Sequence, residues 1–224
     1  MEWRARLQHS HGKRAQPVSK SSLGLAKLAG IIGDSQMLFR LLGILPIMNW
    51  AAKLEQNPNP NPRLLTIERL QALSMLVYFP LDNLYFFGKH SLCPMTAQRK
   101  TSLSLWATRA WAAYVVLQLL HLREDVNVLE KRGQNLRVMI KEQKEKKDLV
   151  IPTGPTDSDM KAEYGAIKKK RSALVLDFIA NLAYFPQAVH WSLEKGYFGN
   201  ELWLTVFGFV ANVASLKKDL DALA

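Results

Sequence analysis

Apolar residues gather in separate stretches along the chain, and charged segments lie between them. The stretches lie near residues 37–52, 70–87, 103–122, 174–193 and 202–216. Within them apolar positions recur three and four residues apart, which is the period of one face of an α-helix. The pattern predicts an all-α protein, a membrane-associated helical bundle in which apolar helices alternate with charged segments.

One motif occurs twice. Residues 76–87 read LVYFPLDNLYFF and residues 182–193 read LAYFPQAVHWSL, so the two YFP tripeptides align. Each copy leads into a short break and then into a second apolar stretch that ends in charged residues. Proline ends or kinks a helix in water, whereas in a membrane neighbouring helices can satisfy the freed carbonyl. The repeat predicts two apolar helix-turn-helix units.

The stretch from Ser102 to Leu122 is the longest candidate for a membrane span. About twenty residues at 1.5 Å each give roughly 30 Å, the thickness of a hydrocarbon core. Arg109 lies a third of the way in, and its guanidinium can reach toward the nearer interface. The last stretch, residues 202–216, gives about 22 Å of helix. It can span the hydrocarbon core only if side chains at its ends reach out to the interface or the bilayer thins. Its small residues Gly208, Ala211 and Ser215 share a face suited to close helix packing.

The segment from Met37 to Met48 has an amphipathic pattern, with Arg40 and Gly43 expected opposite the apolar stripe. The stripe can pack on other helices as part of a core. It can also lie in a membrane interface, with Arg40 reaching lipid headgroups. The pattern alone leaves both readings open.

Composition shifts divide the chain into parts. Residues 1–22 are a basic, polar arm that we expect to be disordered, because it has little to bury. Residues 23–125 form an N-terminal helical half, residues 126–160 a charged linker, and residues 161–224 a C-terminal membrane hairpin. The prolines of PTGPTDSD, residues 152–159, mark the clearest boundary.

The formal net charge of +11 predicts an anionic partner. Lysine and arginine flank the apolar stretches and form no nucleic-acid recognition pattern, so we expect anionic phospholipid and not nucleic acid. The sequence has no paired catalytic carboxylates, no nucleophile with a base and no phosphate-binding glycine loop. It predicts no enzyme, no cofactor and no metal, and the single Cys93 cannot form an internal disulfide.

The order of these motifs resembles the peroxin-eleven family, the peroxisomal membrane proteins that promote elongation and division of peroxisomes. The resemblance covers roughly residues 35–220 and suits the fungal or gamma-like branch. It rests on SQMLFRLLGILP, RLQALSMLVYFPLDNLYFFGK, LSLWATRAWAAYVVLQLLHLRED and LDFIANLAYFPQAVHW, in this order. The basic arm before residue 22 departs from the usual helical start of the family.

The resemblance implies a protein of the peroxisomal membrane whose amphipathic helices insert into one leaflet. It also implies that the protein self-associates and that it recruits dynamin-type fission machinery. The residues that would insert are Met37, Arg40, Leu41, Ile44, Leu45, Met48, Leu73, Val77, Tyr78, Phe79 and Pro80. The residues that would anchor the protein are Trp106, Arg109, Trp111, Tyr184, Phe185, Pro186, His190, Trp191, Trp203, Gly208, Ala211 and Ser215.

Two alternatives to membrane remodelling stay open. Arg40, Arg109 and His190 could line an aqueous path for small anionic metabolites, because ionisable residues at membrane depth usually face cavities. The apolar stretches could also form the core of a non-enzymatic helical scaffold.

Overall fold

The computed structural model of the chain describes residues 20–147, 157–200 and 202–223. The arm at residues 1–19 and the proline-rich boundary at residues 148–156 lie outside them. The elements in order are α2 (Lys20–Arg40), the 3-10 turn η1 (Leu41–Gly43), α3 (Ile44–Gln56), α4 (Pro62–Lys89), α5 (Ala97–Lys147), α6 (Asp157–Ser192) and α7 (Leu202–Leu223). The described residues contain no strand, and the predicted all-α bundle is confirmed.

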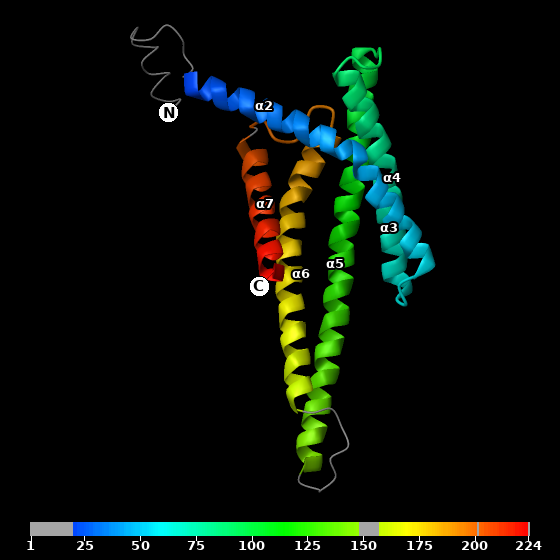
Figure 1. Cartoon of the computed structure of the whole chain (residues 1–224), viewed down its shortest axis with the longest axis vertical. Coiled ribbons are helices and arrows are strands. Elements are labelled where there is room, and N and C mark those ends of the chain that lie inside the picture. The colour runs from blue at the N-terminus through cyan, green and yellow to red at the C-terminus, as the bar shows by residue number, and fades with distance from the viewer. Residues whose placement is uncertain (1–19, 148–156, 201, 224) are drawn as a thin grey trace.

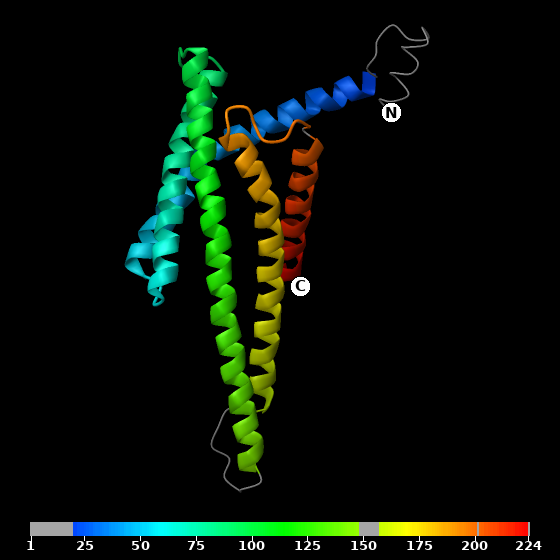
Figure 2. The ribbon, with the colours of Figure 1, turned by 180° about the vertical axis from the view of Figure 1, so that it is seen from behind.

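The helices α4, α5, α6 and α7 lie side by side in chain order, each antiparallel to the one before (Figure 1). The short α3 packs against α4. After the turn η1 the chain changes direction, so α2 crosses the row of helices near the end at which α6 leads into α7 (Figures 1 and 2). The bundle is therefore a row of antiparallel helices with one helix laid across it.

The repeated motif forms two hairpins, as predicted. The first is α4 with α5 and the second is α6 with α7, and in each pair the helices are in extensive contact. Pro80 and Pro186 lie inside α4 and α6, and neither helix ends at its proline. The copies differ in environment, because Phe79 is buried at 8% exposure whereas Phe185 remains 38% exposed.

The first helix of the repeat begins where its sequence predicts. Asn61 caps α4 by accepting a hydrogen bond from the backbone N–H of Arg63 at 3.1 Å, and Pro62 occupies the first helical position. Asn59 in turn accepts from the backbone N–H of Asn61 at 3.0 Å. The NPNPNP segment therefore both ends α3 and starts α4.

The boundary expected after residue 125 falls inside α5. This helix has 51 residues, which at 1.5 Å per residue gives a length of about 76 Å. The charged segment up to Lys147 continues the helix α5, which packs against α6. Leu122, Leu129 and Leu136 are buried there at heptad spacing, and Ile167 of α6 packs against the cluster of Leu122, Leu129 and Leu174.

The paired ends of α5 and α6 project beyond the rest of the bundle (Figures 1 and 2). We call residues 123–147 of α5 with residues 157–173 of α6 the stalk. Its sequence is of mixed charge, and its heptad leucines are buried. A bilayer with a hydrocarbon core of about 30 Å can contain less than half of α5, so the stalk lies outside the apolar part of the molecule.

Candidate membrane-inserting surface

The helices α2 and α3 expose a continuous series of large apolar side chains. Phe39 is 79% exposed and Leu42 is 71% exposed. Other apolar side chains exposed on the same segment are Leu23, Leu25, Leu28, Ile31, Ile32, Leu38, Leu45 and Met48. No residue of α2 is buried, and Leu54 is the buried residue of α3. In water such a surface would be strongly unfavourable, so it marks a site of association with lipid or protein.

Ion pairs tie this segment to α4. Lys89 Nζ donates to Asp34 Oδ1 at 2.7 Å, and Arg40 Nε lies 3.2 Å from Asp82 Oδ2. Farther along, Arg69 binds both carboxylate oxygens of Glu55 on α3, at 2.7 and 2.6 Å. These contacts fix the angle at which α2 crosses the bundle while its apolar residues stay free.

The predicted division of residues 37–48 into a stripe and an opposite face is wrong in part. Arg40 and Gly43, expected opposite the stripe, contact α4 through Asp82 and Phe79. Met37, Leu41 and Ile44 are half-buried, whereas Leu45 and Met48 are exposed. The reason is the turn η1, which interrupts the helical period between α2 and α3. Arg40 is therefore paired with a carboxylate, and its side chain remains 40% exposed.

The predicted inserting residues of α4 separate into two groups. Leu73 and Val77 are 57% and 45% exposed, and Pro80 is exposed beside them. Phe79 is buried under η1, and Tyr78 is half-buried with its hydroxyl 3.4 Å from Asp82. Only the first group can meet lipid directly.

Within the part of the chain that the structure describes, four helical stretches are long and apolar enough to cross a membrane by length and composition. They are Lys20–Gln56, Pro62–Lys89, Ala97–Glu142 and Ala162–Ser192. The first bends at η1, and its α3 part of 13 residues gives only about 20 Å. The helix α7 is not among the four, because every 18-residue window of it contains Lys217, Lys218 and Asp219.

Arg109 lies at the junction of α5 and α6. Its Nε donates to the backbone carbonyl of Ser192 at 3.2 Å, and its guanidinium carbon lies 4.9 Å from the centre of the Trp106 ring. Thr108 donates to the carbonyl of Trp191 at 2.8 Å. The two side chains donate hydrogen bonds to carbonyls at the C-terminal end of α6. A cation at this end also interacts favourably with the negative end of the helix dipole.

Aromatic anchor residues meet at this same end. The Trp111 ring lies 6.2 Å from Tyr184 and 5.9 Å from Trp191, measured between ring centres. Trp106 and Trp203 remain more than half exposed at 59% and 55%. Tryptophan and tyrosine at one level of a bundle are typical of a membrane–water interface.

His190 shapes the turn between α6 and α7. Its Nδ1 accepts hydrogen bonds from the backbone N–H groups of Tyr197 at 2.8 Å and Phe198 at 3.0 Å. Arg40, Arg109 and His190 thus each make a separate contact on a different helix. The structure does not bring the three together around one path.

Sequence reasoning missed the polar contacts between α4 and α5. Gln71, 2% exposed, donates to the side-chain oxygen of Gln118 at 2.6 Å. One turn away, His121 lies 3.1 Å from Glu68 and 3.2 Å from Asp125. Gln71, Gln118 and His121 are polar residues within largely apolar stretches, which was the available signal for a helix–helix hydrogen bond.

The small-residue face of α7 lies against α6. A Cβ on Gly208 would stand 2.8 Å from Gln187 Nε2, and Ala211 is fully buried. Ser215 is half-buried on the same helix, and Gln187 donates to the carbonyl of Leu204 at 2.6 Å. Lys218 closes the contact by donating to Asp177 at 2.8 Å, and this hydrogen bond raises the pKa of Lys218.

These features were compared with known proteins. The sequence model of the family "Peroxisomal biogenesis factor 11 (PEX11)" matches residues 2–219, nearly the whole chain. Searches of curated proteins and of solved structures give no match. The apolar helices, the aromatic end and the family match agree with one another. The chain belongs to the PEX11 family, and like the members of that family it is a protein of the peroxisomal membrane that takes part in peroxisome proliferation.

Proposed function

We propose that this protein elongates and curves the peroxisomal membrane by inserting the apolar surface of α2 and α3 into one leaflet. The observation that carries the proposal is the exposure of that surface: in the most apolar part of Lys20–Gln56, no residue is buried within the protein. Such a helix lies in the plane of the interface with its apolar side chains about 5–10 Å deep. A wedge in one leaflet enlarges that leaflet relative to the other, and the bilayer bends.

The rest of the bundle supplies the anchor. α4, α5 and α6 each contain a stretch able to cross a bilayer, and α2 lies across them at the level where α6 leads into α7 (Figure 1). Because α2 is tied to α4 through Asp34–Lys89 and Arg40–Asp82, a helix lying flat in the interface is held crosswise to helices that span. The protein therefore places its wedge at a fixed depth and angle.

Self-association would concentrate the wedges along a tubule. The exposed apolar residues of α6, among them Phe178 and Leu182 at 47% and 50% exposure, offer a surface for a second copy within the membrane. Recruitment of dynamin-type fission machinery, and membership of the fungal or gamma-like branch, follow from the family resemblance and stay predictions.

Reconstitution of the full chain into anionic liposomes tests the proposal. The variant Leu38→Gln/Phe39→Gln/Leu42→Gln removes apolar surface but keeps residues that favour a helix. We expect wild-type protein to draw out tubules and the variant to leave vesicles spherical, while both resist carbonate extraction because α4–α6 still anchor them. Electron microscopy of the vesicles is the readout.

The control is Val138→Gln/Met139→Gln, which replaces exposed apolar side chains, 56% and 55% exposed, on the stalk. We expect this control to form tubules like wild type. A triple variant that tubulates as strongly as wild type would refute insertion of α2–α3 as the mechanism.

A further inference from the structure

A groove between α5 and α6 runs from the apolar part of the bundle into the stalk. Its lower hollow, of about 420 Å³, is lined by Leu119, Leu122, Arg123, Leu174 and Phe178 among others. Its upper hollow, of about 360 Å³, is lined by residues that include Gly133, Arg137, Tyr164, Lys168 and Arg171. Val126 lines both hollows, so the two lie next to each other along α5 and α6, and we call them together the groove. Each volume lies within the range of small-molecule sites, about 300–1,000 Å³.

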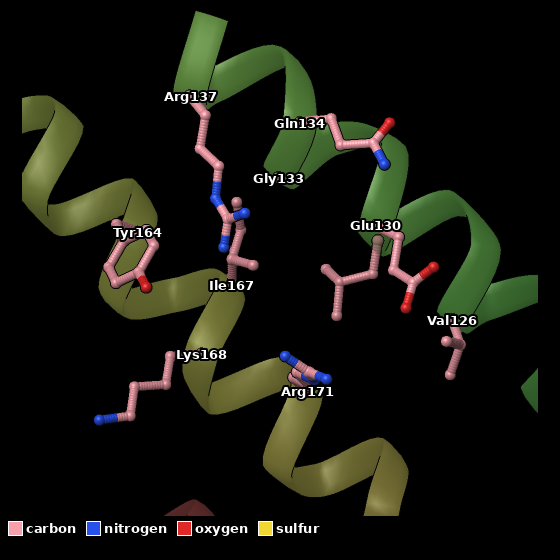
Figure 3. Close-up of a pocket in the computed structure, with 10 residues that line it drawn as sticks. Val126, Glu130, Gly133, Gln134, Arg137, Tyr164, Ile167, Lys168 and Arg171 are labelled. Carbon is pink, nitrogen blue, oxygen red and sulfur yellow. The ribbon is translucent and has the colours of Figure 1, made fainter. Parts of the chain in front are cut away.

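The groove changes from apolar to cationic along its length. The lower hollow is almost entirely apolar, with Arg123 as its charged residue. The upper hollow has three cationic side chains, Arg137, Lys168 and Arg171, against one acidic side chain, Glu130. Figure 3 shows Arg137 reaching from α5 toward Tyr164 and Ile167 of α6, one turn beyond Gly133.

Within the described residues these cations have no ionic partner. None of Arg137, Lys168 and Arg171 has an ion pair with any residue in the described part of the chain. The same two helices do form such a pair elsewhere, because Arg132 lies 2.9 Å from Glu163. Unpaired guanidinium groups facing a hollow are suited to phosphate, which they bind through two parallel hydrogen bonds.

The position of the groove identifies the kind of phosphate. The apolar run of α5 ends at Leu122 and that of α6 begins near Leu174, so this level marks the edge of the hydrocarbon core. Arg171 is three residues from Leu174, about 4.5 Å along the helix, and lies at headgroup depth. Arg137 is fifteen residues from Leu122, about 22 Å, and its side chain leans back toward the membrane. A ligand that meets both must carry phosphate at two heights.

We propose that this groove binds a phosphoinositide, with an acyl chain in the lower hollow and the phosphorylated inositol ring between Arg171 and Arg137. The glycerol phosphate meets Arg123 and Arg171, and the ring phosphates meet Arg137 and the Tyr164 hydroxyl. The site is separate from α2 and α3, so it does not rest on their insertion into a leaflet.

Gly133 gives the groove its room. A Cβ added there would meet no atom within 4 Å, and glycine inside a helix lowers its stability. Gly133→Leu therefore fills the upper hollow without changing charge, and it favours the helix. A loss of lipid binding in this variant would therefore come from blocking the groove and not from a loss of positive charge.

The test uses the full chain in non-ionic detergent micelles, titrated with dioctanoyl phosphatidylinositol bisphosphate. We expect saturable binding that is weakened at least tenfold by Gly133→Leu and by Arg137→Gln/Arg171→Gln. The control Lys131→Gln/Lys141→Gln removes the same charge from exposed stalk positions outside the groove and should bind like wild type. Circular dichroism checks that each variant keeps its helix content.

Competition distinguishes the ligand classes. Dioctanoyl phosphatidylserine and soluble inositol trisphosphate should each compete at least tenfold more weakly than the probe lipid. Equal competition by phosphatidylserine, equal competition by the soluble headgroup, or unchanged binding by Gly133→Leu would each overturn the proposal. Because the readout is binding in micelles, its failure is distinguishable from a failure to form tubules.

Discussion

The ring of Phe79 on α4 fills the space beside Gly43 in which any larger residue would place its side chain. A Cβ on Gly43 would stand 2.8 Å from the Phe79 ring carbon Cζ and closer still to its neighbour Cε1. Phe79 is buried, so the ring has little room to move away. The close approach of these two residues allows the turn between α2 and α3 to pack directly against α4.

Gly43→Ala should weaken the packing of the turn η1 against α4. Overpacking of a buried contact costs about 1–3 kcal/mol, and we expect a loss of unfolding free energy in that range. Limited proteolysis in detergent should cleave α2 and α3 faster than in wild type. The control Gly30→Ala has open space at its Cβ and should be neutral or stabilising by about 0.5–1 kcal/mol, because alanine favours a helix. Equal behaviour of the two variants would contradict the packing argument.

Arg109→Ala should lower stability by about 2 kcal/mol, because it removes a charged hydrogen bond to the end of α6. Arg109→Lys keeps the cation near the Ser192 carbonyl and should recover part of the loss. Thermal unfolding in detergent measures both. If Arg109 instead lined a pore, planar-bilayer conductance would fall in Arg109→Ala while the unfolding temperature stayed at the wild-type value.

His190→Ala should destabilise the turn between α6 and α7 by about 2 kcal/mol, since two backbone N–H groups lose their acceptor. His190→Asn offers a side-chain oxygen close to the place of Nδ1 and should retain most of the stability. Protease cleavage within residues 193–200 reports the opening of the turn. Cleavage at the wild-type rate in His190→Ala would show that the histidine does not hold it.

Helix positions and the repeat could be predicted from the sequence because both depend on local signals. Helical spacing and the prolines inside the YFP motif each act within a few residues. The unbroken joining of the charged segment to the apolar part of α5 could not be predicted in the same way. Its charged half is helical because α6 covers Leu129 and Leu136, and that partner lies beyond the proline-rich boundary.

Which face of each helix is buried depends on contacts between residues that are distant in the sequence, so it could not be predicted from local patterns. Arg40 forms an ion pair with Asp82, and Gly43 packs against Phe79, each about forty residues farther along the chain. The aligned Phe79 and Phe185 differ in exposure because the turn η1 covers Phe79, whereas Phe185 remains 38% exposed. Periodicity gives a helix two faces and does not say which of them another helix will cover.

The unbroken course of α5 makes it a stiff rod that joins the lipid phase to the surrounding water. Its outer 25 residues, 123–147, form an arm of about 38 Å, so a change of about 10° in how the inner half leans would swing the tip by about 7 Å. Any change in membrane thickness or curvature that re-angles the embedded half is thereby converted into a displacement that a partner at the tip could sense.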